Sequence, residues 1–263
     1  MHHQVGVGYT GRMGNGVTSG LRTQVLDTYE AVSGAAAEFI CTELEQRPNL
    51  LLCVSAGATP TRTYEILAAQ RTRQPKLFDR LRVLQVDEWA GLGLGDPATC
   101  AADLRRKVLD PLRISPDRFR ALRTDATDLE AECDRMRDWL AANGPIDICI
   151  LGLGANGHVA MNEPAAALTP RAHVAALAES SRNHGMLKDL ARKPRYGLTL
   201  GMADILGSRR VLMLVNGSRK RPAVKRLMKP QVTTRFPASF LWLHPDATVL
   251  CDREAAPNSG ARG

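Results

Sequence analysis

Short apolar runs alternate along the chain with segments that carry apolar residues at helical spacing, and this alternation constrains the fold most strongly. Buried strands are predicted at residues 50–54, 82–89, 147–152, 210–215 and 248–251. Helices are predicted at residues 26–44, 60–70, 96–112, 128–142 and 170–190. Strands that alternate with helices form mostly parallel sheets. We therefore predict an α/β fold, doubly wound and Rossmann-like, with a mostly parallel sheet and helices on both faces.

The chain has room for one domain of this kind. It contains 263 residues, 44% of them hydrophobic, and we find no internal repeat or linker that divides it. We expect a single α/β catalytic domain over residues 26–253. The glycine-rich start, residues 1–25, and the polar end, residues 254–263, are predicted to be flexible tails.

The cysteines and the length of the apolar runs indicate a reducing compartment. None of the six cysteines forms a Cys-x-x-Cys pair, and at least three lie in apolar runs, which is typical of buried thiols. No segment approaches the roughly 18 consecutive apolar residues of a membrane span, and residues 1–20 lack the apolar core of a signal peptide. We expect a cytoplasmic protein with no membrane partner.

The net charge of +8 favours an anionic ligand. The cationic residues are scattered, and no basic run with interleaved aromatic residues occurs. The sequence therefore favours a small anionic metabolite over nucleic acid.

The most distinctive stretch, residues 147–164, joins a buried strand to a glycine-rich loop that contains His158 and Glu163. Glycines let the backbone turn sharply and approach a ligand closely. A titratable pair just past the carboxyl end of a buried strand lies where open α/β sheets bind substrates. We interpret this loop as catalytic. The alternative is a strand-to-helix turn whose histidine caps a neighbouring segment.

A second loop, residues 55–60, is typical of an anion site. Gly57, Ala58 and Thr59 stand between a predicted strand and a predicted helix. Thr59 is a candidate N-cap residue, and Pro60 suits the first helical position. Backbone N–H groups and the helix dipole at such a position favour a phosphate. No Walker motif is present, and an ordinary strand-to-helix turn is the alternative.

Two further strand ends carry charged side chains. Asp87 lies near the end of the run at residues 82–89, where a partly desolvated carboxylate can act as a base, although the local sequence alone slightly favours a solvated loop carboxylate. Lys220 follows the run at residues 210–215 in a Gly-Ser-Arg-Lys turn. In a doubly wound sheet, such strand ends lie along one edge and can share a crevice.

This inventory suits proton transfer on a phosphorylated sugar. It holds a phosphate loop, a carboxylate, a histidine–carboxylate pair and a lysine, without a Cys or His pair at metal spacing. Residues 152–157 match the dinucleotide fingerprint loosely, but no acidic residue ends a following strand about twenty residues on. We therefore expect no metal, no NAD and no other cofactor.

The motifs closely resemble those of the glucosamine-6-phosphate deaminase/isomerase family, over about residues 30–253. The matching motifs are Val-Asp-Glu-Trp at 86–89, Gly-Leu-Gly-Ala-Asn-Gly-His-Val-Ala-Met-Asn-Glu-Pro at 152–164 and Gly-Ser-Arg-Lys at 217–220. The features most similar to the galactosamine-6-phosphate branch are Asn156, residues 184–188 and residues 237–244. The Asn-Glu-Pro ending distinguishes this family from the related 6-phosphogluconolactonases.

The resemblance assigns roles residue by residue. It implies that Asp87 moves a proton between carbons 2 and 1 of the open-chain sugar. It implies that His158 is the acid/base of ring opening, with Glu163 as its carboxylate support. The phosphate would bind to Gly57, Ala58 and Thr59, with Arg182 and Lys220 as cationic partners.

Asn156 departs from the glucosamine enzymes, which the resemblance expects to carry an aspartate there. An amide can orient His158 but cannot act on it through a full charge. The expected activity is conversion of galactosamine 6-phosphate to tagatose 6-phosphate and ammonia. The alternatives are a glucosamine-6-phosphate deaminase that gives fructose 6-phosphate, a 6-phosphogluconolactonase and a non-catalytic sugar-phosphate sensor. Relatives include single subunits and symmetric assemblies, so the resemblance is also compatible with a homo-oligomer.

Overall fold

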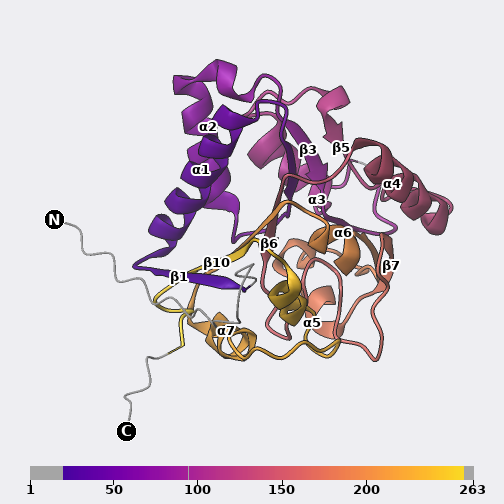
Figure 1. Cartoon of the computed structure of the whole chain (residues 1–263). Coiled ribbons are helices and arrows are strands. Elements are labelled where there is room, and N and C mark those ends of the chain that lie inside the picture. Colours follow the sequence, from indigo (N-terminus) through magenta and orange to yellow (C-terminus); the bar gives the residue numbers. More distant parts are fainter. Residues whose placement is uncertain (1–19, 94, 258–263) are drawn as a thin grey trace, which may run out of the picture.

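The computed structural model describes residues 20–93 and 95–257 (Figure 1). The strands are β1 (Arg22–Leu26), β2 (Leu51–Val54), β3 (Arg82–Gln85), β4 (Asp87–Trp89), β5 (Phe119–Arg120), β6 (Ile148–Gly152), β7 (His173–Ala176), β8 (Tyr196–Thr199), β9 (Arg210–Val215) and β10 (Ala247–Asp252). The α-helices are α1 (Tyr29–Gln46), α2 (Thr61–Arg73), α3 (Cys100–Leu104), α4 (Leu129–Asn143), α5 (Glu179–Arg182), α6 (Met202–Leu206) and α7 (Arg221–Leu227).

A seven-stranded sheet in the order β1-β10-β9-β6-β2-β3-β5 forms the centre of the fold. All its neighbouring strands run parallel. From β2 the chain extends the sheet through β3 to β5, and it then returns to β6 and builds in the opposite direction. The order therefore reverses between β2 and β6, and open α/β sheets bind ligands outside the carboxyl ends of the strands at such a point.

Helices cover both faces of this sheet, as the alternation of the sequence predicts. Because successive strand residues point to opposite faces, Leu52 and Ile150 pack into a core with α1 and α2, which lie together on one side in Figure 1. Cys53 and Leu151 point the other way and pack into the core formed with α4, α6 and α7. The fold is a doubly wound, mostly parallel α/β sheet.

A second sheet of three antiparallel strands, β4-β8-β7, continues from the first. The run at residues 82–89, predicted as one strand, is divided at Val86. The N–H of Val86 donates to the Val54 carbonyl in the large sheet, at 3.1 Å, while its carbonyl accepts from Leu200 N–H, at 2.9 Å, beside the small sheet. The chain therefore passes from the large sheet to the small sheet at Val86, and Asp87 is the next residue.

The expected tails are too long at both ends. Residues 22–25 belong to β1, which forms one edge of the large sheet and pairs in parallel with β10 from Arg22 to Leu26. At the other end, Ala255 is fully buried and donates its N–H to the Asp252 carboxylate, at 2.8 Å. The remaining parts of the predicted tails, residues 1–19 and 258–263, lie outside the described residues.

Two helix predictions also need correction. The segment 170–190 forms strand β7, the one-turn helix α5 and a 3-10 turn (Gly185–Leu187), because its apolar residues pair with β8. The segment 96–112 is helical only from Cys100, where α3 passes into a π-helical turn (Arg105–Leu109). Within residues 20–93 and 95–257, no helix has both the length and the apolarity needed to cross a membrane.

Candidate active site

A cavity of about 270 Å³ opens at the carboxyl edge of β9, β6, β2 and β3, beside the reversal in strand order. Six of the nine predicted site residues line it: Gly57, Ala58, Thr59, Asp87, His158 and Lys220. Glu163 and Asn156 belong to the same loop as His158 but do not line the cavity. Asn156 is hydrogen-bonded to both Glu163 and His158. Arg182 is exposed on α5 and does not line the cavity, although its neighbours Ser180 and Ser181 do.

Asp87 lies half-buried in the cavity wall, and its carboxylate has no hydrogen-bond or ion-pair partner within the described part of the chain. Burial, and secondly the nearby negative charge of Glu88, raise the pKa of Asp87 to about 7. A carboxylate with this pKa can accept and return a proton near neutral pH.

Glu88 points away from the cavity and has a structural role. Its fully buried carboxylate accepts from the N–H groups of Cys100 and Ala101 at the start of α3, each at 2.8 Å. The Gln85 amide and the Trp89 N–H, also at 2.8 Å, complete its hydrogen bonds. Burial raises the pKa of Glu88, and these hydrogen bonds oppose that rise. Of the two adjacent carboxylates, only Asp87 is free for chemistry.

His158 faces the cavity from the loop that follows β6. A Cβ atom at Gly154 would lie 2.5 Å from its imidazole ring, so only glycine leaves room for this ring position. The Asn156 side-chain oxygen accepts the His158 backbone N–H at 3.0 Å. His158 Nδ1 lies 3.4 Å from Glu163 Oε2, which leaves Nε2 as the nitrogen available to a ligand.

Glu163 is held from three sides. Asn156 Nδ2 donates to Oε2 at 2.9 Å, while the Ser181 hydroxyl and the Ala178 N–H donate to Oε1. Burial opposes ionisation of this carboxyl, but the contacts with His158, Ser181 and Asn156 outweigh burial and lower its pKa to about 2. Glu163 is therefore ionised throughout the physiological range and can orient His158 and stabilise its protonated form.

The phosphate loop differs in detail from its prediction. Pro60, not Thr59, occupies the N-cap position of α2, and no side chain caps this helix. Gly57 adopts φ +103°, and its N–H donates to Asp103 Oδ2 at 3.0 Å instead of facing the cavity. The N–H groups of Ala58 and Thr59 have no partner within the described residues, so they are the donors available to an anion.

Two tyrosines hold this loop in place. The Tyr29 hydroxyl lies 3.0 Å from the Ala58 carbonyl and 2.9 Å from the Thr59 carbonyl, and it accepts from Arg62 N–H. The Tyr64 hydroxyl donates to the Ser55 carbonyl at 2.8 Å. The loop therefore has a fixed shape before any ligand binds.

Lys220 reaches the same cavity from the turn after β9. Its ammonium group donates to the Leu153 carbonyl at 2.6 Å, which ties the turn to the loop of His158. Burial, with the neighbouring Arg219, lowers the pKa of Lys220. It supplies a cation between the phosphate loop and His158.

Sequence reasoning missed the role of His184, which it noted only as part of a family motif. This side chain lines the cavity, with its ring 5.9 Å from that of Trp89 and its Cε1–Nε2 edge facing Gly57. Its Nδ1 accepts the Met186 N–H, at 3.3 Å, so the neutral ring carries its proton on Nε2. Burial of the ring, and secondly the positive charges of His158 and Lys220, lower the pKa of His184. A histidine inside a predicted helix, as His184 is within residues 170–190, gives no signal that its side chain faces a distant loop.

The described residues contain no group of three or more His, Cys, Asp or Glu side chains that could hold a metal ion. Their cysteines are all free thiols, and all but Cys41 are buried. The cavity thus offers an acid/base pair, a free carboxylate and an anion-binding end.

Comparison with known proteins connects this geometry to a family. Residues 27–250 match the family model described as glucosamine-6-phosphate isomerases/6-phosphogluconolactonase. The chain is 38% identical to the AgaI protein of Escherichia coli (strain K12), provisionally called a deaminase, over 86% of this chain and 90% of that protein. It is 34% identical to glucosamine-6-phosphate deaminase 1 of Bacillus subtilis (strain 168), over 90% of this chain and 98% of that protein.

Solved structures show the same fold. A monomeric glucosamine-6-phosphate deaminase of the NagB superfamily superposes with a TM-score of 0.86 at 34% identity, covering 89% of this chain and 98% of that one. The 6-phosphogluconolactonase of Trypanosoma brucei has a TM-score of 0.71 at 21% identity, covering 89% of this chain and 97% of that one. At that identity the second likeness shows the fold alone.

Proposed function

Since this chain belongs to the family of glucosamine-6-phosphate isomerases and 6-phosphogluconolactonases, we propose that it deaminates and isomerises an amino-hexose 6-phosphate. The proposed reaction converts galactosamine 6-phosphate and water to tagatose 6-phosphate and ammonia. The observation that carries this proposal is the Asp87 carboxylate, which lies in the cavity wall without a protein partner and with a pKa of about 7.

The proposed reaction begins with binding of the phosphate. The Ala58 and Thr59 N–H groups and the Lys220 ammonium are its proposed donors, because all three residues line the cavity and the two N–H groups have no partner within the described residues. A phosphate held far from the reacting carbons supplies binding energy that orients the sugar. Arg182 is proposed as a further cation only if α5 moves, since its side chain is exposed outside the cavity.

Proton transfers follow at the other end. His158 protonates the ring oxygen as the pyranose opens, and the ionised Glu163, which lies 3.4 Å from Nδ1, orients the imidazole so that Nε2 is left for the sugar. Asp87 then removes the proton from carbon 2, which gives an enolamine, and delivers it to carbon 1, while one proton of the amine passes to oxygen 1 so that the aldehyde becomes a CH2OH group. This leaves an imine at carbon 2, to which water adds before ammonia leaves. The pKa of about 7 lets Asp87 both accept and return this proton near neutral pH.

A glucosamine-6-phosphate deaminase is the second candidate. The similarity to the Bacillus subtilis enzyme and to the monomeric deaminase supports it as directly as the similarity to AgaI supports the first. Asn156 favours the galactosamine reading only through the family resemblance. The two substrates differ in configuration at carbon 4. No contact within the described residues identifies a side chain that distinguishes the two configurations.

The test is an ammonia-release assay with galactosamine 6-phosphate and glucosamine 6-phosphate side by side. We expect the kcat/KM for galactosamine 6-phosphate to be the higher of the two. The reverse order would favour the second candidate. Hydrolysis of 6-phosphogluconolactone without ammonia release would indicate a lactonase, and saturable binding of the sugars without turnover would indicate a sensor.

A further inference from the structure

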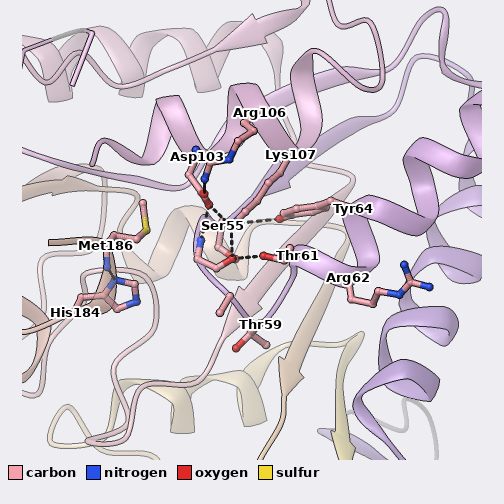
Figure 2. Close-up of polar contacts among 12 residues, drawn as sticks. Ser55, Thr59, Thr61, Arg62, Tyr64, Asp103, Arg106, Lys107, His184 and Met186 are labelled. Atoms are coloured by element: carbon pink, nitrogen blue, oxygen red, sulfur yellow. Dashed lines mark hydrogen bonds and ion pairs between the residues drawn. The ribbon is translucent and has the colours of Figure 1, made fainter. Parts of the chain in front are cut away.

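Both polar backbone atoms of Gly57 face away from the cavity. Its N–H donates to Asp103 Oδ2 at 3.0 Å, and its carbonyl accepts from the Thr61 hydroxyl at 2.7 Å and the Lys107 ammonium at 3.1 Å. Asp103 and Lys107 lie together beside the loop, with Asp103 drawn above the loop and His184 across from it in Figure 2. At φ +103° this arrangement turns the chain so that the next two N–H groups are left for a ligand.

Asp103 and Lys107 also bind each other, which closes a ring of contacts around Gly57. Lys107 Nζ lies 2.8 Å from Asp103 Oδ2, the oxygen that accepts the Gly57 N–H. The Asp103 side chain is only 4% exposed and that of Lys107 is 20% exposed. Arg106 binds the other oxygen of Asp103 at 2.6 Å, but its own side chain is 65% exposed.

The position of Asp103 creates an electrostatic conflict. A buried carboxylate directly behind an anion-binding loop repels the anion, and the repulsion is strong because little water screens it. Lys107 neutralises that charge from inside the protein, next to the loop. The exposed Arg106 contributes less, since solvent screens its charge.

The same short helix connects this ring to the strand that carries Asp87. Glu88, the neighbour of Asp87, binds the N–H groups of Cys100 and Ala101 at the start of α3. Asp103 lies one turn later, and Lys107 follows in the π-helical turn after α3. Helix α3 therefore fixes the phosphate loop relative to the strand that carries Asp87.

We propose that Asp103 and Lys107 are positioning residues for the phosphate loop. Asp103 fixes the Gly57 peptide so that the Ala58 and Thr59 N–H groups face the cavity, and Lys107 both completes the ring and cancels the charge of Asp103. This inference rests on the proposed phosphate-binding role of the loop. It predicts that the two residues have opposite effects on anion affinity, which a purely structural ion pair would not have.

The experiment compares Lys107→Met, Asp103→Asn and the double variant. The readouts are the dissociation constant for inorganic phosphate, by calorimetry, and KM and kcat for galactosamine 6-phosphate. We expect Lys107→Met to weaken phosphate binding and raise KM by about tenfold, equivalent to roughly 1.4 kcal/mol, with a much smaller change in kcat. Asp103→Asn should leave affinity unchanged or increased, since the repelling charge is gone while an acceptor for Gly57 remains. The double variant should recover most of the affinity lost in Lys107→Met.

Arg106→Met is the matched control, because Arg106 pairs with the same carboxylate from solvent and does not touch Gly57. Its phosphate affinity should stay within about twofold of the wild-type value. Equal losses in Lys107→Met and Asp103→Asn, or no recovery in the double variant, would overturn the proposal.

The outcomes also separate this proposal from the proposed function. A wild-type protein that binds phosphate but releases no ammonia would refute the function while leaving the phosphate measurements decisive for the loop. If Lys107→Met does not fold, as judged by circular dichroism, the neutral double variant and the charge-conserving Lys107→Arg provide the comparison. Weaker phosphate binding in the neutral pair than in Lys107→Arg by more than about tenfold would then contradict charge cancellation.

Discussion

Asp87 and Glu88 show how two adjacent carboxylates acquire different roles. Strand geometry points them to opposite sides, so Glu88 anchors α3 while Asp87 faces the cavity. The fixed charge of Glu88 and the burial of Asp87 together raise the pKa of Asp87 to about 7. At residue scale, a structural carboxylate raises the pKa of the carboxylate that we propose as the base.

Glu88→Gln tests this tuning through the pH dependence of kcat/KM. In the wild type, activity should fall as pH drops below about 7, because protonated Asp87 cannot act as a base. The glutamine removes the neighbouring charge, so the pKa of Asp87 should decrease and the acidic limb should move to lower pH. Ionisations of the substrate are common to both profiles and cancel in the comparison. An acidic limb that stays in place would refute the coupling between these residues.

At the scale of elements, segment 178–187 gives the cavity a wall that a regular helix would not provide. It places Ser181 on Glu163 and His184 opposite Gly57, with the His184 ring near Trp89. The lowered pKa of His184 keeps its ring neutral near pH 7, with Nε2–H as a donor beside the phosphate loop. This donor adds no charge to a cavity that already contains Lys220.

His184→Ala tests whether this donor binds substrate. We expect KM to rise by about tenfold to a hundredfold, the effect of losing one hydrogen bond to a charged group, while kcat falls less. His184→Gln, which can still donate from a similar position, should recover part of the loss. Equal KM values in the wild type and His184→Ala would exclude a substrate contact.

The strand ends could be predicted from sequence because apolar runs and glycine-rich turns are local signals. The loop after the apolar run at 147–152 and the turn at 217–220 lie at the carboxyl edge, as expected. The split at Val86 could not be predicted, because it depends on where β2 ends and β8 begins. Strand β7 was read as helix for the same reason, since only pairing with β8 makes His173–Ala176 extended.

At the scale of the whole molecule, the site exists because the sheet order reverses between β2 and β6. This reversal brings four segments together around one cavity: residues 55–59, 87–89, 153–164 and 216–220. The family resemblance recognised from these loops is confirmed by the match over residues 27–250. Contacts between distant segments, such as Gly57 with Asp103, leave no pattern in a single sequence.

The stability of the folded protein should also depend on pH, because folding buries the Asp87 carboxylate. The folded-state pKa of Asp87 lies above its usual value of 3.8, so the native state binds this proton more tightly than the unfolded state does. Between about pH 4 and 7, rising pH therefore destabilises the wild type through this group. Asp87→Asn should have a higher Tm than the wild type at pH 8, and the difference should shrink at pH 5. A Tm gap that is absent at pH 8 would show that the Asp87 environment does not penalise its charge.

The central claim is that Asp87 is the base that moves the proton between carbons 2 and 1. Ammonia release from galactosamine 6-phosphate by Asp87→Asn tests it most directly, because the amide keeps the shape of the side chain and removes its basicity. General bases contribute between about a hundredfold and ten-thousandfold, so we predict a loss of kcat in that range in a variant that remains folded. Near-normal ammonia release by folded Asp87→Asn would contradict the account.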